Sequence, residues 1–89
     1  MSTPSEIQAV FQKLASYCAY QERSKQEVWV KLEGMGLDES EKNAVVEALE
    51  EDNFLNEKRF AEVFAGSKFR QKKWGKNKIK QALLQKGIS

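Results

Sequence analysis

Apolar residues recur at helical spacing in five stretches of the chain, and turn-forming residues separate these stretches. The first and longest stripe consists of Ile7, Val10, Phe11, Leu14, Tyr17 and Cys18. Shorter stripes follow around Leu32, Leu49, Phe64 and Leu83. No stretch alternates apolar and polar positions with β-branched residues, which is the pattern of a strand. The hydrophobic pattern therefore predicts an all-α chain.

The expected helix starts carry residues that cap a helix. Thr3, Ser24 and Asp38 are each followed three positions later by a glutamate, which is the pattern of a capping box. Pro4 follows Thr3 at the first helical position, where proline is favoured. Asn56 can cap a fourth helix. These signals predict where the first four helices begin.

The expected helix ends carry residues that tolerate a left-handed backbone. Gly34 and Gly36 can end the second helix, and Asn53 can end the third. The Trp74-Gly75 pair separates the fourth helix from the fifth, and Gly87 follows the fifth. Five helices with short connections are therefore expected.

Two of the helical stretches repeat each other at an offset of 51 residues. Residues 25–32 (KQEVWVKL) align with residues 76–83 (KNKIKQAL), and Met35-Gly36-Leu37 aligns with Lys86-Gly87-Ile88. A period near 50 residues indicates tandem helical units. We therefore predict a complete three-helix unit in residues 1–55 and a second unit in residues 56–89 that lacks its third helix.

Charge divides the chain in two. Residues 1–65 hold 7 Lys/Arg and 13 Asp/Glu, whereas residues 66–89 hold 8 Lys/Arg and no acid. A segment this basic favours an acidic partner, either nucleic acid or an acidic protein surface. The alternative is a solvated helix face with no partner.

The candidate binding residues are the basic side chains of this segment and its tryptophan: Lys68, Arg70, Lys72, Lys73, Trp74, Lys76, Lys78 and Lys80. On a helix Lys76 and Lys80 share one face, while Lys78 points elsewhere. The basic surface is therefore broad, which suits phosphate contacts rather than the reading of bases. Trp74 either stacks on a base or a partner's arginine, or fills the turn between two helices.

The first unit is a poor candidate for reading DNA as a helix-turn-helix. Its third helix would be the recognition helix, yet residues 38–52 are strongly acidic and would repel phosphates. The acids at the end of that helix suit Mg²⁺ binding or an acid/base pair, but we prefer a solvated face. Their cost to the helix dipole leaves open a use such as pairing with Arg23 or Lys25. Trp29 and Cys18 are expected in the core.

Composition excludes several classes of function. The chain has no His and one Cys, which excludes most zinc sites and any Cys–His or Ser–His nucleophile. It has no P-loop and no dinucleotide-binding glycine motif. We therefore expect no enzyme, no cofactor and no metal. No apolar run approaches the length of a membrane span, no secretory signal is present, and a lone Cys18 fits a cytoplasmic protein.

Three stretches together resemble the RecX family. Residues 22–37 resemble its R-S-x-x-E-L-x-x-K-L-x-x-K-G signature, and residues 53–61 resemble its G-Y-L-D-D-E-R-F-A signature. Residues 75–88 resemble its G-x-x-x-I-x-x-x-L-x-x-K-G-I signature. Asn53 and Asn56 depart from the usual Gly and Asp but keep a left-handed stop and a cap. Family members usually carry three units, so this chain is expected to be incomplete.

The resemblance implies a cytoplasmic regulator of RecA recombinase, usually an inhibitor, that binds the RecA–DNA filament and contacts DNA through phosphates. It also implies an elongated run of three-helix units. Two alternatives remain from the residues alone: a sequence-nonspecific nucleic-acid-binding helical module with no RecA partner, or a bare helical interaction domain. An incomplete second unit would expose Ile79, Leu83, Leu84 and Ile88, which predicts self-association.

Overall fold

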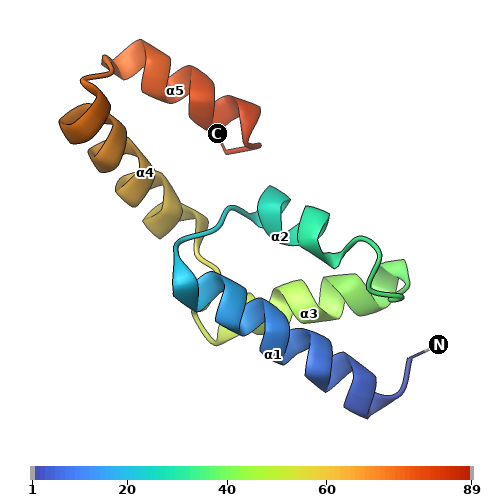
Figure 1. Ribbon diagram of the computed structural model, residues 1–89. Coiled ribbons are helices and arrows are strands. Elements are labelled where there is room, and N and C mark those ends of the chain that lie inside the picture. The colour runs from blue at the N-terminus through green and yellow to red at the C-terminus, as the bar shows by residue number, and fades with distance from the viewer. Residues whose placement is uncertain (1, 89) are drawn as a thin grey trace.

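The computed structural model describes residues 2–88, and these residues form five α-helices and no strand (Figure 1). The helices are α1 (Pro4–Tyr20), α2 (Lys25–Leu32), α3 (Glu39–Glu51), α4 (Glu57–Lys72) and α5 (Lys76–Gln85). The prediction of an all-α chain is confirmed.

All three predicted capping boxes form. The side chain of each cap residue, Thr3, Ser24 or Asp38, accepts a hydrogen bond from the backbone N–H three residues later. The glutamate at that third position accepts one from the N–H of the cap residue in return. Asn56 caps α4 as predicted, because its Oδ1 accepts from the backbone N–H of Arg59 at 2.9 Å. Local sequence thus sets where these four helices start.

The helix ends also follow the predicted stops, with one addition. Asn53 has φ 61°, and Gly36 and Gly87 have φ 79° and 81°. The addition is Lys73, which adopts the left-handed conformation at φ 59° and ends α4 just before Trp74. Sequence reasoning missed Lys73, because lysine is not a residue that favours this conformation.

The first three helices share one hydrophobic core. α3 lies against α1 and α2, and the side chains of Leu14, Val28, Leu32 and Leu49 are at most 1% exposed. Cys18 is buried among them, as expected. Trp29, which is also expected in the core, is half-buried and packs against it.

The last two helices form a second unit, in which α5 folds back against α4. Phe60 of α4 and Ile79 of α5 are the buried apolar residues of this pair. The expectation that Ile79 is exposed was wrong, because the return of α5 onto α4 covers the face of the helix that carries it. Leu84 is exposed as expected, while Leu83 and Ile88 are half-buried.

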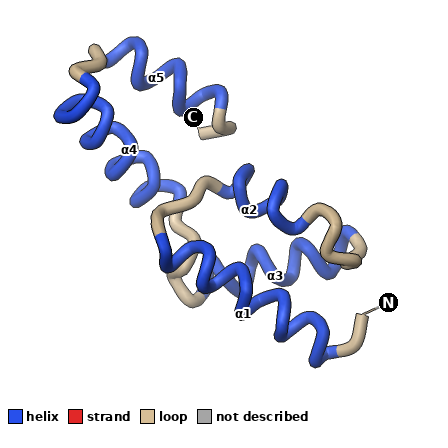
Figure 2. The backbone as a smooth tube through the Cα atoms, in the orientation of Figure 1, coloured by secondary structure: helices blue, strands red, loops and turns tan. Residues whose placement is uncertain are grey.

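The two units follow each other along a long molecule. The principal extents are 47 × 20 × 19 Å and the radius of gyration is 14.6 Å, whereas a compact domain of this length would have about 12 Å. Figure 1 and Figure 2 show that α1 and α4 run in a similar direction, and that α2 and α5 each turn back after them. The tandem arrangement predicted from the repeat is therefore present.

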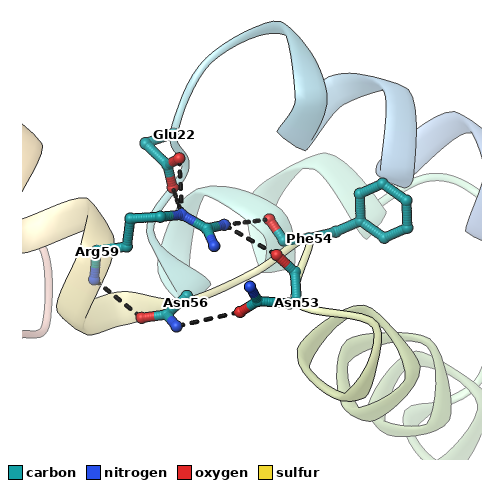
Figure 3. A network of polar contacts seen from close by, with 5 residues as sticks. All are labelled: Glu22, Asn53, Phe54, Asn56 and Arg59. Atoms are coloured by element: carbon teal, nitrogen blue, oxygen red, sulfur yellow. Dashed lines mark hydrogen bonds and ion pairs between the residues drawn. The ribbon is translucent and has the colours of Figure 1, made fainter.

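Arg59 joins the two units at the start of α4 (Figure 3). Its Nε donates to both carboxylate oxygens of Glu22, at 2.9 and 2.8 Å. Its Nη2 donates to the backbone carbonyls of Asn53 and Phe54, at 3.0 and 3.3 Å. One guanidinium thus links the loop after α1, the turn after α3 and the first turn of α4. This contact helps to set the direction in which α4 leaves the first unit.

Candidate nucleic-acid interface

The eight predicted binding residues lie on the last turns of α4, in the following turn and on the first turns of α5. Lys68 and Trp74 are half-buried, and the other six are exposed. The structure divides them into three groups. One surrounds an aromatic pair, one lines an apolar groove, and one lies near the end of α4.

Trp74 lies in the turn between α4 and α5 and packs on Phe64. The two rings meet edge to face, with centroids 6.5 Å apart and planes at 70°. Phe64 in turn stacks on the buried Phe60, with centroids 5.8 Å apart. Trp74 therefore fills the turn between the two helices, which is one of the two interpretations of this residue from the sequence. Part of its ring stays accessible.

Lysines surround this aromatic pair. The Nζ of Lys78 lies 4.5 Å from the centroid of Trp74, and the Nζ of Lys68 lies 5.1 Å from it. The Nζ of Lys86 lies 5.7 Å from the centroid of Phe64. These separations are within the range of cation–π attraction. We call Phe64, Lys68, Trp74, Lys78 and Lys86 the tail cluster.

Sequence reasoning did not place Phe64 and Lys86 in the candidate site. Phe64 was assigned to the core stripe of its helix. Lys86 belongs to the basic segment, but it is not one of the candidate lysines, which end at Lys80. Lys86 follows the last residue of α5, and the return of that helix brings its side chain beside α4. The turn between α4 and α5 is therefore what completes the cluster.

Lys76 and Lys80 line the other side of α5, as the spacing predicts. They border a groove between α4 and α5 with a volume of about 300 Å³. The apolar residues that line it are Ala61, Ala65, Ile79, Leu83, Leu84 and Ile88. This groove is the surface from which self-association was expected, and self-association stays a prediction.

The remaining three candidates do not join the tail cluster. The guanidinium of Arg70 folds over Gly66 on its own helix, where an added Cβ would lie 2.9 Å from Nη1. Lys72 is the last residue of α4, and Lys73 is its left-handed cap. Their side chains extend the basic surface along the end of the helix.

No ion pair neutralises this surface within residues 2–88. The ion pairs there are Lys25–Glu50 at 3.9 Å, Lys42–Glu33 at 3.5 Å and Arg59–Glu22 at 2.8 Å. All three involve cations of the acidic part of the chain, and the first is one of the two pairings that the sequence left open for the acids at the end of α3. The cations from Lys68 onwards keep their charge available for a partner.

The start of α5 is unfavourable for helix stability. In α2 the cap Ser24 and the glutamate Glu27 form a capping box. At the aligned positions α5 has Gly75, which makes no side-chain cap, and Lys78. Cations near a helix N-terminus oppose the helix dipole and cost about 0.3–1 kcal/mol each. The second unit thus has positive charge where the first has a stabilising acid.

Within residues 2–88, no three His, Cys, Asp or Glu side chains come together in an arrangement that could hold a metal ion. Within the same residues, no helix is both long and apolar enough to cross a membrane.

Comparison with known proteins identifies a family for the second unit. Residues 56–89 match the family model of the RecX second three-helix domain. The chain is 38% identical over 68 residues to a protein of Chlorobium phaeobacteroides (strain BS1) named "Regulatory protein RecX". That alignment covers 76% of this chain and 45% of the relative.

Two further relatives have the same name. The one from Clostridium perfringens (strain SM101 / Type A) is 36% identical over 67 residues, which is 75% of this chain and 31% of the relative. The one from Bacillus cytotoxicus is 29% identical over 83 residues, which is 93% of this chain and 31% of the relative. The chain thus spans less than half the length of the curated relatives it matches. No solved structure matches.

The resemblance to the RecX family that the sequence motifs indicated is confirmed. The chain is similar to RecX regulatory proteins over most of its length, with helical units in tandem.

Proposed function

We propose that this RecX-like chain is a regulator of RecA recombinase, an inhibitor, that binds the RecA–DNA filament. The names of its relatives support a regulatory role. In this proposal the chain acts in the cytoplasm by binding alone, with no reaction and no cofactor. We also keep the division into units of residues 1–55 and 56–89 as part of the proposal. It is supported by the packing of α3 against α1 and α2 and of α5 against α4.

The observation that carries the proposal is the uncompensated charge of the second unit. Eight cations follow residue 65, and none forms an ion pair with a carboxylate of residues 2–88. Lys76 and Lys78 lie in the first turn of α5, where positive charge weakens a helix. A sequence shaped for stability alone would not keep them there, so an anionic partner is a better explanation.

The two units suit different parts of a protein–DNA filament. The basic surface of the second unit fits phosphates or acidic protein segments. The acidic α3 of the first unit fits basic parts of the protein component. An elongated body of 47 Å can follow a filament and contact both. Salt dependence of binding is therefore expected.

The test is a RecA assay with and without this chain. We expect the chain to slow both DNA-dependent ATP hydrolysis and strand exchange. A variant with Gln at Lys72, Lys73, Lys76 and Lys80 should lose most of this effect. A control variant with Gln at Lys25 and Lys58 removes two charges from outside the basic surface. Unchanged rates with the intact chain would refute the proposal.

The second candidate function is a sequence-nonspecific nucleic-acid-binding module with no RecA partner. It is favoured by the lysines around the accessible ring of Trp74. If about five phosphates of duplex DNA are contacted, log K should fall with log salt at a slope of about −4 to −5. Binding to DNA at this slope, together with unchanged RecA rates, would select this candidate. A slope that the four lysine substitutions leave unchanged would exclude Lys72, Lys73, Lys76 and Lys80 as the contact.

A further inference from the structure

The cations of the acidic first part of the chain are not spread evenly. Of the 7 Lys/Arg in residues 1–65, three are held in ion pairs: Lys25, Lys42 and Arg59. Two of the other four, Arg23 and Lys31, lie over the ring of Tyr17, and a third, Lys13, lines the same depression as Tyr17 and Lys31. The exception is Lys58, which is exposed on α4. Unpaired positive charge in this part is thus concentrated on one face.

Tyr17 is the centre of this face. The Cζ of Arg23 lies 3.7 Å from the centroid of its ring, and the Nε of Arg23 donates to the Tyr17 carbonyl at 3.0 Å. The Nζ of Lys31 lies 5.3 Å from the same centroid. Lys13 lines a depression beside them that has a volume of about 620 Å³. Its other lining residues are Gln12, Leu14, Ser16, Tyr17, Lys31 and Met35.

An exposed aromatic ring borders this face. Tyr20 is 83% exposed, the highest exposure among the large apolar and aromatic side chains that stand in solvent. The Cζ of Arg23 lies 5.9 Å from its ring centroid. An aromatic ring this accessible, with the guanidinium of Arg23 next to it, offers a platform on which a base can stack.

Two acids close to Arg23 in the sequence, Glu22 and Glu27, have other partners. Glu22 accepts from the Nε of Arg59, and Glu27 accepts from the backbone N–H and the hydroxyl of Ser24. Neither carboxylate forms an ion pair with Lys13, Arg23 or Lys31 among the described residues. The three charges therefore remain available to an outside anion.

The tail cluster occupies the corresponding place in the second unit. There too an aromatic ring of the first helix, Phe64, is approached by cations, from Lys68 on α4 and from Lys86 just after α5. Arg23 and Trp74 stand at aligned positions, 51 residues apart in the chain. The helix pairs α1–α2 and α4–α5 follow a similar course (Figure 1), and in each unit cations lie beside an aromatic ring of its first helix.

We propose that Lys13, Tyr17, Tyr20, Arg23 and Lys31 form a second nucleic-acid contact, specific for single strands, in the first unit. The three cations bind phosphates, and a base stacks on Tyr20. A single strand fits this arrangement because its bases can leave the stack and lie on an aromatic ring, whereas those of a duplex cannot. The inference rests on the proposed function and extends it: the acidic unit also contacts the nucleic acid.

The test measures binding of the 89-residue chain to a fluorescent oligothymidine of about 20 nucleotides at several salt concentrations. Replacing Lys13 and Lys31 with Gln should make the slope of log K against log salt shallower by about 1.4, since each phosphate of a single strand contributes about 0.7. The control variant, with Gln at Lys25 and Lys58, loses the same charge from outside the face. Equal slopes for the two variants would overturn the inference.

The stacking part is tested by Tyr20→Ala, with Val30→Ala as the control because Val30 is 67% exposed on α2. Tyr20→Ala should weaken binding to oligothymidine at least about fivefold, and Val30→Ala should not. The change should be absent with a duplex of the same length. An equal loss with the duplex, or no loss with the single strand, would overturn the single-strand assignment.

These outcomes differ from a failure of the proposed function. If the substitutions at Lys13, Lys31 and Tyr20 change nothing while the four tail substitutions still weaken binding, this inference fails, and the proposed function is decided separately by the RecA assay. If Lys13 and Lys31 are needed for binding to polyglutamate but not to oligothymidine, the face serves an acidic protein, and the inference fails as well.

Discussion

The Nε of Arg59 donates to both carboxylate oxygens of Glu22, across 37 residues of chain. The same guanidinium reaches the carbonyls of Asn53 and Phe54 in the turn that precedes α4 (Figure 3). The start of the second unit is thus hydrogen-bonded to the loop that follows α1 in the first unit. This relationship matters for function because it helps to fix how the two charged units are presented together.

Arg59→Ala should lower the free energy of unfolding by about 1–2 kcal/mol, since it removes charge-assisted hydrogen bonds that are only partly exposed. Arg59→Lys should recover part of this loss, because lysine keeps the charge but not the fork of donors. Urea denaturation followed by circular dichroism measures both. A double-mutant cycle with Glu22→Gln should give a coupling of about 0.5–1 kcal/mol. Strictly additive effects would show that the contact does not hold the units together.

Restoring a capping box at the start of α5 should stabilise the chain and weaken binding. The variant replaces Gly75 with Ser and Lys78 with Glu, which copies Ser24 and Glu27 of α2. Gly75 has φ −76° and open space around its Cβ position, so serine fits. We expect a gain of about 0.5–1.5 kcal/mol in unfolding free energy. Affinity for DNA should fall, since Lys78 leaves the tail cluster.

Gly75→Ser alone is the control for this trade between stability and binding. It should add a few tenths of a kcal/mol without changing affinity. If the double variant binds DNA as tightly as the parent chain, Lys78 is not part of the interface.

Trp74→Ala should destabilise the second unit, because the ring packs on Phe64 and fills the turn between α4 and α5. We expect a loss of about 1–3 kcal/mol for a half-buried aromatic side chain. Trp74→Phe should recover much of the stability. The readout is hydrogen exchange of the amides in α5, which should speed up in the alanine variant. Unchanged exchange would show that the ring contributes little packing.

Stability should fall as the pH drops below about 4.5, the ordinary range of carboxyl groups. The hydrogen bond from the backbone N–H of Glu41, and then that from the Ser40 hydroxyl, lower the pKa of Asp38. Bonds from Thr3 lower the pKa of Glu6 in the same way. A carboxylate with a lowered pKa binds fewer protons in the folded state, so its stabilisation is present above the unfolded pKa and is lost as the pH falls through the folded pKa.

The measurement is the thermal midpoint between pH 2 and pH 6, for the parent chain and for Asp38→Asn. Asparagine can still accept the capping bond but does not titrate. The variant should therefore show a smaller decline in midpoint at low pH. An identical decline would mean that the cap at α3 does not contribute to acid sensitivity.

Cys18 should react slowly with thiol reagents in the folded chain. Burial raises the pKa of its thiol, and the charge of Arg23 offsets this only in part. The thiolate is the reactive form, so less of it is present at neutral pH than in an exposed cysteine. The rate of modification by a chromogenic disulfide should rise sharply across the urea transition. A fast reaction with the native chain would contradict the buried position of Cys18.

Much of the local structure could be predicted from the sequence. The capping boxes at Thr3, Ser24 and Asp38 depend on residues within one helical turn of each other, so their partners are adjacent in the chain. The left-handed stop at Asn53 and the core position of Cys18 follow from residue type and helical spacing. The spacing of Lys76, Lys78 and Lys80 also predicted which of them share a face of α5.

The sequence by itself determined the helices, the repeat at 51 residues, the division of charge and the family resemblance. Only the tertiary structure decided which cations are paired, that Ile79 is covered, and that Lys86 lies beside Phe64. The physical reason is the distance along the chain over which each interaction acts. Helix starts and stops depend on neighbouring residues, whereas ion pairing and burial depend on the direction in which a turn sends the next helix. The turn after α4 depends on the left-handed backbone of Lys73, which the residue type does not predict.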